Sequence, residues 1–340
     1  CIRDRIDLAF SQLGHLSQNY LNAAKDAIKA ADVVIFSHPW AYPLLANALS
    51  HKQIVIYDSQ NVEGYLRAQL LDEKNTTEAA LLRNVVEDVY ELGYRADLIL
   101  ACSQEDVSRF NRVYEFPFDK MRVAPNGVMA FTHEQPDQCS KATAKRILKL
   151  DESKLTAIFI GSPYGPNLDA AQFISDSLAG SMPEVTFVIA GGVGERISST
   201  HRIVIITGSI DEDQKHQWFC AADSAVNPML SGSGTNIKMF DFMSLGLPTV
   251  TTAIGARGIE TGSQQAMIIC KPNVDSFVSA INKLQDAGLR ESIGKEARNC
   301  IEDGYAWERI SHQIGSLLRQ RYKHSGQPKP LFSVVIPSYE

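Results

Sequence analysis

The sequence predicts an α/β protein built on parallel sheets. Short runs rich in Val and Ile alternate with longer stretches of helical periodicity, an order typical of repeated strand–helix–strand units. The short runs are apolar throughout, as expected for strands that helices cover on both faces. With 340 residues, the chain can form two domains, each burying its own core.

The predicted elements follow one another in a regular order. In the first half we expect strands at 33–36, 54–57, 98–101 and 121–124. Helical periodicity predicts helices at 5–29, 41–50, 62–72, 76–95 and 104–114. In the second half we expect strands at 155–160, 185–190, 203–206, 224–226, 248–252 and 267–270. Helices are expected there at 167–179, 212–221, 236–245, 274–287, 289–302 and 306–322.

These elements divide the chain into expected parts. Residues 1–135 form a first Rossmann-like domain, and residues 136–150, which carry no strong strand signal, form a linker. Residues 151–304 form a second Rossmann-like domain, and 305–322 form a helix crossing back to the first. Such a domain normally opens with a strand and its glycine-containing loop. Neither precedes Val33, so the first domain is expected to be incomplete in this chain.

Charge and composition narrow the classes of partner. The formal net charge is -6 and neither half of the chain is basic, so nucleic acid is not expected as a partner. The six cysteines form no C-x-x-C pair and are expected to be free thiols in a reducing cytoplasm. No apolar run reaches the length of about 18 residues that a membrane-spanning helix needs.

The most informative segment is a glycine- and serine-containing loop that opens directly onto a helix. Gly232 and Gly234 can adopt positive φ and let backbone N–H groups approach a ligand closely. The first turn of the helix leaves its N–H groups unpaired and carries partial positive charge. These features suit a diphosphate. The expected contacts from this loop are Gly232, Ser233, Gly234, Thr235 and Asn236.

Two charged residues follow on the same helix. Lys238 adds a cation, and Asp241 lies three residues on, on nearly the same helix face. A carboxylate there could accept hydrogen bonds from sugar hydroxyls, so the pair suits a nucleotide. The alternative is an ordinary helix start on the surface, with Lys238 and Asp241 as a solvated pair. Gly246 and Pro248 then predict the end of the helix.

Other unusual residues follow predicted strands, where ligands of open α/β sheets bind. Gly161, Ser162 and Asn167 follow strand 155–160, and their small loop would leave room for phosphate. Gly191 and Gly192 follow strand 185–190 and could let a nucleobase or ribose lie against the backbone. Nearby Arg196 could reach a phosphate or be a solvated loop charge.

In the first half, His38 follows strand 33–36. It could bond a donor sugar or an acceptor hydroxyl, or simply a backbone carbonyl. Asp58 and Glu63 follow strand 54–57; for Asp58 we favour helix capping, and Glu63 is left between capping and a pocket role.

The motifs together resemble a known family. The run Ala221-Ala222-Asp223, Pro228, Gly232-Ser233-Gly234-Thr235, Lys238, Asp241 and Gly246-Leu247-Pro248-Thr249-Val250-Thr251-Thr252 looks like the donor-binding half of glycosyltransferase family 4. Asp97–Ser103 with Pro125–Val128, Tyr305–Glu308 and Tyr57–Glu63 resemble other parts of that family. The resemblance covers about residues 30–322.

The resemblance implies the GT-B fold, in which two Rossmann-like domains face each other across a cleft. It implies sugar transfer with retention from a nucleotide-sugar, a UDP- or GDP-sugar, to a glycan or lipid-linked saccharide, in cell-surface polysaccharide synthesis. His38, Lys238 and Asp241 are the expected catalytic residues. No metal and no further cofactor is expected. A cytoplasmic location follows, with peripheral contact at the inner face of the membrane.

This chain departs from the family at three places. Asp241 stands where members usually have Glu, and Ser233 stands where many have a first Glu that would meet the donor sugar. The loop from Gly161 to Asn167 lacks the Arg and Lys that many members carry, so Lys238 is expected to supply most of the side-chain charge at the diphosphate. A sugar-nucleotide epimerase of the same fold and a catalytically silent nucleotide-binding module are the alternatives.

The last segment, 323–340, is a polar linker followed by a strand and a turn. The strand resembles the opening strand of a family 2 glycosyltransferase of the GT-A type, and we expect the start of a second module. The alternative is an edge strand that completes this chain's own sheet.

Overall fold

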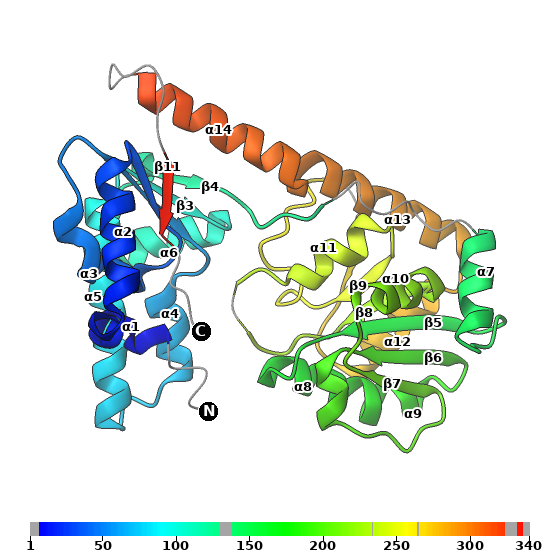
Figure 1. The fold of residues 1–340 in the computed structure, drawn as a ribbon. Helices are drawn as coiled ribbons and strands as arrows, with labels where there is room; N and C mark the ends of the chain where they lie inside the picture. Colours follow the sequence, from blue (N-terminus) through cyan, green and yellow to red (C-terminus); the bar gives the residue numbers. More distant parts are fainter. Residues whose placement is uncertain (1–6, 130–137, 233, 264, 324–331, 336–340) are drawn as a thin grey trace. The chain divides into compact units, whose positions relative to one another are not determined.

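The computed structural model describes residues 7–129, 138–232, 234–263, 265–323 and 332–335 (Figure 1). The chain divides into an N-terminal unit, Cys1–Pro125 with Gln313–Glu340, and a C-terminal unit, Asn126–His312. Each unit is built around one parallel sheet, as the sequence predicts. Within the described residues, no helix has both the length and the apolar composition needed to cross a membrane.

The sheet of the N-terminal unit has the strand order β11-β1-β2-β3-β4. All pairs are parallel. The strands are β1 (Val33–Phe36), β2 (Ile54–Ser59), β3 (Leu98–Ala101), β4 (Met121–Val123) and β11 (Phe332–Val335). The helices are α1 (Phe10–Leu13), α2 (Gln18–Ala30), α3 (Tyr42–Leu45), α4 (Glu63–Leu70), α5 (Thr76–Arg95) and α6 (Gln104–Tyr114).

Alternate strand residues face two separate cores, which is the consequence of the two-residue repeat of a strand. On β1, Val34 and Phe36 join a large core with side chains of α2, α5 and α6. Val33 faces the other way, into a smaller core that includes Ile314 and Leu317 of helix α14 (Trp307–Lys323). Both faces of the sheet are therefore covered.

The predicted helix at 5–29 is interrupted in the structure. It separates into α1 and α2 at Gly14–Ser17, with Ser17 outside helical geometry (φ -94°, ψ 67°). A Cβ added to Gly14 would lie 2.6 Å from Cδ1 of Leu44, so the chain passes close to α3 at this point. The break in the helix therefore coincides with close packing against another segment. Helical periodicity in the sequence does not reveal such packing.

The strand near the end of the chain lies at the edge of this sheet. Residues 332–335 pair in parallel with β1, with Val33 opposite Phe332. This is the edge-strand alternative, and it differs from our expectation that the segment opens a sheet of its own. Pairing here satisfies the backbone groups along one edge of β1.

The sheet of the C-terminal unit has the order β10-β9-β8-β5-β6-β7, again with parallel pairs throughout. The strands are β5 (Leu155–Ile160), β6 (Val185–Ala190), β7 (Val204–Gly208), β8 (Ser224–Asn227), β9 (Thr249–Thr251) and β10 (Ile268–Ile269). The helices are α7 (Gln138–Ile147), α8 (Gly165–Gln172), α9 (Ala179–Ser181), α10 (Glu212–Ala221), α11 (Ile237–Ser244), α12 (Val274–Lys283) and α13 (Ala287–Cys300).

Strand β5 is central to this unit. Its Phe159 packs in a core with Phe277 of α12, whereas Ile158 faces a second core with Phe219 of α10 and Phe240 of α11. From β5 the chain proceeds to β6 and β7 on one side, and β8, β9 and β10 lie on the other. The strand order therefore reverses between β5 and β8, which is the position where open α/β sheets bind ligands.

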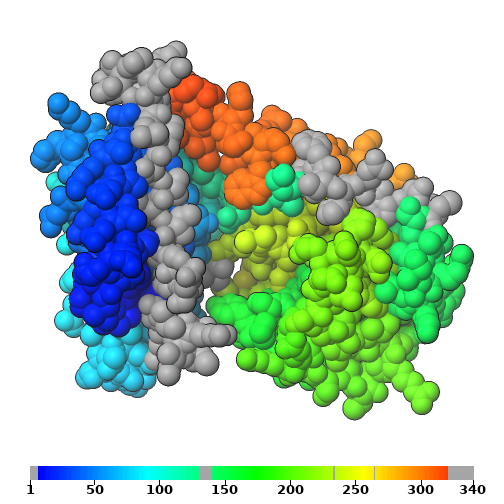
Figure 2. Space-filling model, viewed as in Figure 1, coloured from blue at the N-terminus to red at the C-terminus, as the bar shows by residue number. Residues whose placement is uncertain are grey.

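The expected linker at 136–150 is instead largely helix α7, and the boundary between the units falls at Pro125 and Asn126. Helix α7 lies beside α10 (Figure 1 and Figure 2). Lys145 of α7 donates to the buried carboxylate of Asp223 over 2.6 Å. Lys141 of the same helix lies 3.4 Å from Asp223, and Ala144 and Leu148 pack in a small apolar cluster with Trp218 of α10.

Candidate functional site

The loop before α11 has the backbone geometry that the sequence predicts. Gly232 and Gly234 both have positive φ, 125° and 70°. The carbonyl oxygen of Gly234 accepts hydrogen bonds from Nε and Nη2 of Arg257, at 3.2 and 3.0 Å. This contact anchors the loop just before the helix. Ser233, also predicted here, lies outside the described residues.

The amino end of α11 makes no side-chain cap. Asn236 is the N-cap residue, yet its side chain donates to the carbonyl of Ile254 at 3.2 Å and accepts nothing from the helix. The N–H groups of the first turn, beginning at Ile237, are therefore not satisfied by a capping side chain. Such a helix end attracts an anion.

A cavity of about 490 Å³ lies in front of this helix end. It is lined by the loop after β5, by the loop after β8 and by side chains of α10 and α11, and so lies at the position where the strand order reverses. We call it the donor cavity, after the nucleotide-sugar donor that the resemblance leads us to expect. Eight predicted residues line it: Gly161, Ser162, Asn167, Gly232, Thr235, Asn236, Lys238 and Asp241.

Lys238 is the cation at the base of this cavity. Its Nζ donates to Oδ1 of Asn167 over 2.7 Å and lies 4.2 Å from the centroid of the Phe159 ring. Burial lowers the pKa of Lys238 to about 7. Within the described part of the chain, no carboxylate lies within ion-pair distance of this ammonium. It is held by an amide and a ring, and an anion in the cavity would be its natural counter-charge.

Asn167 is fixed in turn by its own neighbours. Its Nδ2 donates to the carbonyl of Ser162 at 3.1 Å and lies 3.3 Å from the Ser162 hydroxyl. These two contacts set the orientation of the amide so that Oδ1 faces Lys238. The loop after β5 and the first turn of α8 therefore position the lysine without supplying charge of their own.

Asp241 does not pair with Lys238. Its Oδ2 lies 3.1 Å from Nζ of Lys215, which belongs to α10. Lys215 also lies 3.4 Å from the carboxylate of Glu212. The alternative in which Lys238 and Asp241 form a solvated pair with each other is therefore wrong. Lys215 was missed by the sequence analysis, since a single lysine in a predicted helix carries no sign of its partner.

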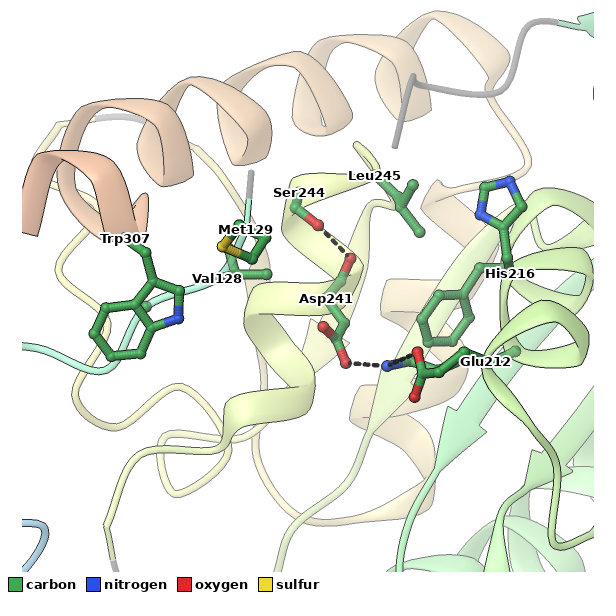
Figure 3. A pocket seen from close by; sticks show the side chains of 11 residues that line it. Val128, Met129, Glu212, His216, Asp241, Ser244, Leu245 and Trp307 are labelled. Atoms are coloured by element: carbon green, nitrogen blue, oxygen red, sulfur yellow. Dashed lines mark hydrogen bonds and ion pairs between the residues drawn. The ribbon is translucent and has the colours of Figure 1, made fainter. Parts of the chain in front are cut away.

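A second cavity of about 290 Å³ adjoins the first at this ion pair (Figure 3). We call it the second cavity. Its lining includes Val128, Met129 and Trp307, whose side chains lie on one side of Asp241, and Glu212 and His216 of α10 on the other (Figure 3). Lys215 and Asp241 line both cavities.

Four predicted residues of the C-terminal unit are not among the described residues that line the donor cavity. Gly191 has φ 87°, and an added Cβ would lie 2.6 Å from the carbonyl oxygen of Gly161. It therefore allows the ends of β5 and β6 to lie close together, and Gly192 packs near Pro163. Arg196 is exposed at the end of a short helical turn. Gly234 is also absent from that lining and shapes the loop.

His38 belongs to the N-terminal unit and lies two residues after the end of β1. Its ring stacks on that of Trp40, with centroids 6.4 Å apart. Burial lowers the pKa of His38, although the carboxylates of Asp7 and Asp58 act in the opposite direction. Glu63 is buried and paired with Arg67, whose Nε lies 3.1 Å from its carboxylate.

Among the described residues, no group of three or more His, Cys, Asp or Glu side chains is arranged so that it could hold a metal ion.

Comparison with solved structures identifies the fold class. Sucrose-phosphate synthase (tll1590) from Thermosynechococcus elongatus superposes with a TM-score of 0.71 at 17% identity, covering 92% of this chain and 80% of that one. Anabaena Alr3699/HepE in complex with UDP gives 0.71 at 17%, covering 91% and 84%. WaaG, a glycosyltransferase involved in lipopolysaccharide biosynthesis, gives 0.60 at 15%, covering 81% and 80%. The chain has the GT-B fold of two Rossmann-like sheets, as predicted.

Comparison of the sequence points to the same class. Residues 154–287 match the family model described as glycosyl transferases group 1, a range that contains β5, β8 and α11. A Klebsiella pneumoniae protein, described as an uncharacterized 44.6 kDa protein in the cps region, is 23% identical over 183 residues. The match covers 49% of this chain and 46% of that protein, so this chain spans less than half the length of the curated relative.

Proposed function

We propose that this chain forms the nucleotide-binding part of a retaining glycosyltransferase, which moves a sugar from a nucleotide-sugar to a glycan or lipid-linked acceptor. The observation that carries the proposal is the donor cavity: an uncapped helix end and a buried lysine without a carboxylate partner meet where the strand order reverses. Both features favour a diphosphate.

The comparisons support a particular donor and setting. Anabaena Alr3699/HepE, which shares the fold, was solved with UDP and with UDP-glucose, so a UDP-sugar is the first donor to test, and a GDP-sugar the second. The relative from the cps region supports a role in cell-surface polysaccharide synthesis. We place the reaction in the cytoplasm, with the protein in peripheral contact with the membrane that carries a lipid-linked acceptor.

In the proposed reaction, the main task of the protein is to stabilise charge on the leaving group. As the bond from the sugar to the diphosphate breaks, negative charge grows on the phosphate oxygens, and the N–H groups of α11 and the ammonium of Lys238 face that charge. Asp241 accepts hydrogen bonds from hydroxyl groups of the nucleotide. The sugar passes through a state with oxocarbenium character.

Retention without a protein nucleophile is part of the proposal. The leaving phosphate oxygen takes the proton of the acceptor hydroxyl, which attacks the same face of the sugar. His38 then acts as a hydrogen-bonding group for the donor sugar or acceptor rather than as an obligatory base.

Two experiments test the proposal. In the first, a crystal soaked with UDP or GDP should show the diphosphate at residues 232–238; a ligand bound elsewhere with this cavity empty would refute it. In the second, the protein is incubated with a panel of sugar nucleotides, with and without a lipid extract as acceptor. Acceptor-dependent transfer is expected. Hydrolysis or inversion of the donor without acceptor would indicate the epimerase, and binding without turnover would indicate a silent module.

A further inference from the structure

The ion pair of Lys215 and Asp241 lies between the donor cavity and the second cavity. Both side chains line both cavities, and they come from different helices, α10 and α11. The ammonium of Lys215 lies within ion-pair distance of two carboxylates, those of Asp241 and Glu212. The conformation of this pair therefore determines the shape of the wall that the two cavities share.

Lys215 is held mainly by Asp241. The Nζ–Oδ2 distance to Asp241 is 3.1 Å, and the Asp241 side chain is only 27% exposed. The contact with Glu212 is 3.4 Å, but the Glu212 side chain is 85% exposed and solvent screens it. The ammonium also lies 5.8 Å from the centroid of the Phe219 ring.

The two lysines of the donor cavity differ in charge state. Burial lowers the pKa of Lys215, but Asp241 and then Glu212 act in the opposite direction and the net pKa is raised. The pKa of Lys238 is lowered to about 7. Above pH 7, Lys215 therefore keeps its charge in the free protein while Lys238 loses its own.

Asp241 needs a positively charged partner because it borders a cavity that suits an anion. An unpaired carboxylate there would repel a diphosphate. The contact with Lys215 uses Oδ2, and no described residue bonds to Oδ1. A paired Asp241 thus balances its charge and still offers one oxygen to a hydroxyl group.

We propose that Lys215 is a positioning residue of the donor site. It holds the Asp241 carboxylate so that Oδ1 accepts a hydrogen bond from a ribose hydroxyl, and it cancels the repulsion between this carboxylate and the diphosphate. The inference rests on the proposed function, because it takes the ligand to be a nucleoside diphosphate.

The test measures by calorimetric titration the affinities for UDP and for dideoxy-UDP, which lacks both ribose hydroxyls. If the wild type binds GDP more tightly than UDP, GDP and dideoxy-GDP are used instead. The wild type should bind UDP about tenfold more tightly than dideoxy-UDP, as expected for a hydrogen bond to a charged group. Lys215→Met and Asp241→Asn should each lose most of this preference. The double variant should lose no more than Asp241→Asn alone.

Two further variants separate positioning from general damage. Lys215→Arg retains the charge and should recover most of the preference for UDP. Lys283→Met, on an exposed position of α12 that lines neither cavity, should leave both affinities unchanged. Wild-type discrimination in Lys215→Met would overturn the proposal. If Lys215→Met weakened the binding of UDP and of dideoxy-UDP by the same factor, the positioning role would also be overturned, since Lys215 would then act only on the charge at the phosphates.

Thermal unfolding of the same variants reports on the pair without any ligand. The changes in unfolding free energy caused by Lys215→Met and Asp241→Asn should not add up in the double variant, because the two side chains contact each other. Additive changes would overturn the role of Lys215 even if UDP binds. Failure of the wild type to bind UDP or GDP would instead refute the proposed function, and the positioning role with it.

Discussion

The lowered pKa of Lys238 predicts that nucleotide binding takes up a proton. In the free protein this pKa is about 7, because burial disfavours the ammonium. A diphosphate in contact with the ammonium favours the charged form and raises the pKa again. At pH 8, Lys238 is about one-tenth protonated when free and almost fully protonated when bound, so binding should take up about 0.9 proton.

The sign and size of the pH dependence follow from this linkage. The anion binds the protonated lysine. The titration of Lys238 should therefore cause little change in affinity at pH values well below 7, and affinity should fall as the pH rises through 7. Each pH unit above that point should weaken binding about tenfold, or about 1.4 kcal/mol. The terminal phosphate of UDP has lost its second proton by then, so a window from about pH 7.5 to 9.5 isolates the lysine.

Isothermal titration calorimetry in two buffers of different ionisation enthalpy measures the proton uptake directly. Lys238→Met should bind UDP weakly and without pH dependence in this window, whereas Lys283→Met should behave as the wild type. A wild-type affinity that stays flat across the window would refute the reasoning. The same conclusion would follow if Lys238→Met kept the wild-type slope.

Three further predictions concern neighbouring features. Asn167→Asp places a carboxylate where Oδ1 now accepts a hydrogen bond from Lys238 over 2.7 Å. UDP binding should weaken, and its pH dependence should move above the range of about pH 7.5 to 9.5, because the carboxylate favours the charged lysine. Titrations that match the wild type would contradict this. Gly191→Ala should lower the free energy of unfolding by about 1–3 kcal/mol, because φ is 87° and the added Cβ meets a backbone oxygen. Gly165→Ala, with open space around its Cβ, is the control in urea unfolding. Lys145→Met should lower the free energy of unfolding by about 1–3 kcal/mol, because the buried Asp223 then keeps only the longer contact with Lys141 and the N–H of Thr156. Arg146→Met, at a neighbouring side chain that is 71% exposed, should lower the free energy of unfolding by less than about 0.5 kcal/mol. Equal losses of stability in the two variants would argue against the buried pair.

Local signals in the sequence account for much of the fold. Helices 76–95, 104–114 and 212–221 have the predicted bounds. Each begins at a polar residue whose side chain caps it, Asn75, Ser103 and Asp211. Capping depends on residues at most three positions apart, so it can be recognised in the sequence. The positive φ of Gly232 and Gly234 was predictable for the same local reason.

The donor cavity was predictable in outline. The order of strands and loops places Gly161, Thr235 and Lys238 at one edge of a parallel sheet, and all three line the cavity. Gly191 and Gly192 follow the neighbouring strand, yet they serve the packing of β6 against β5. A loop's place in the strand order therefore located the site, but did not decide which loops reach the cavity.

The sequence by itself determined the parallel α/β class, most of the elements and the loop that opens onto α11, because these depend on propensity, periodicity and capping among near neighbours. Only the tertiary structure decided that Asp241 pairs with Lys215, that α7 is held through Asp223 and that residues 332–335 join β1. These are contacts between residues far apart in the chain. Their partners are chosen by packing and by the burial of charge, and neither can be read from the residues on either side.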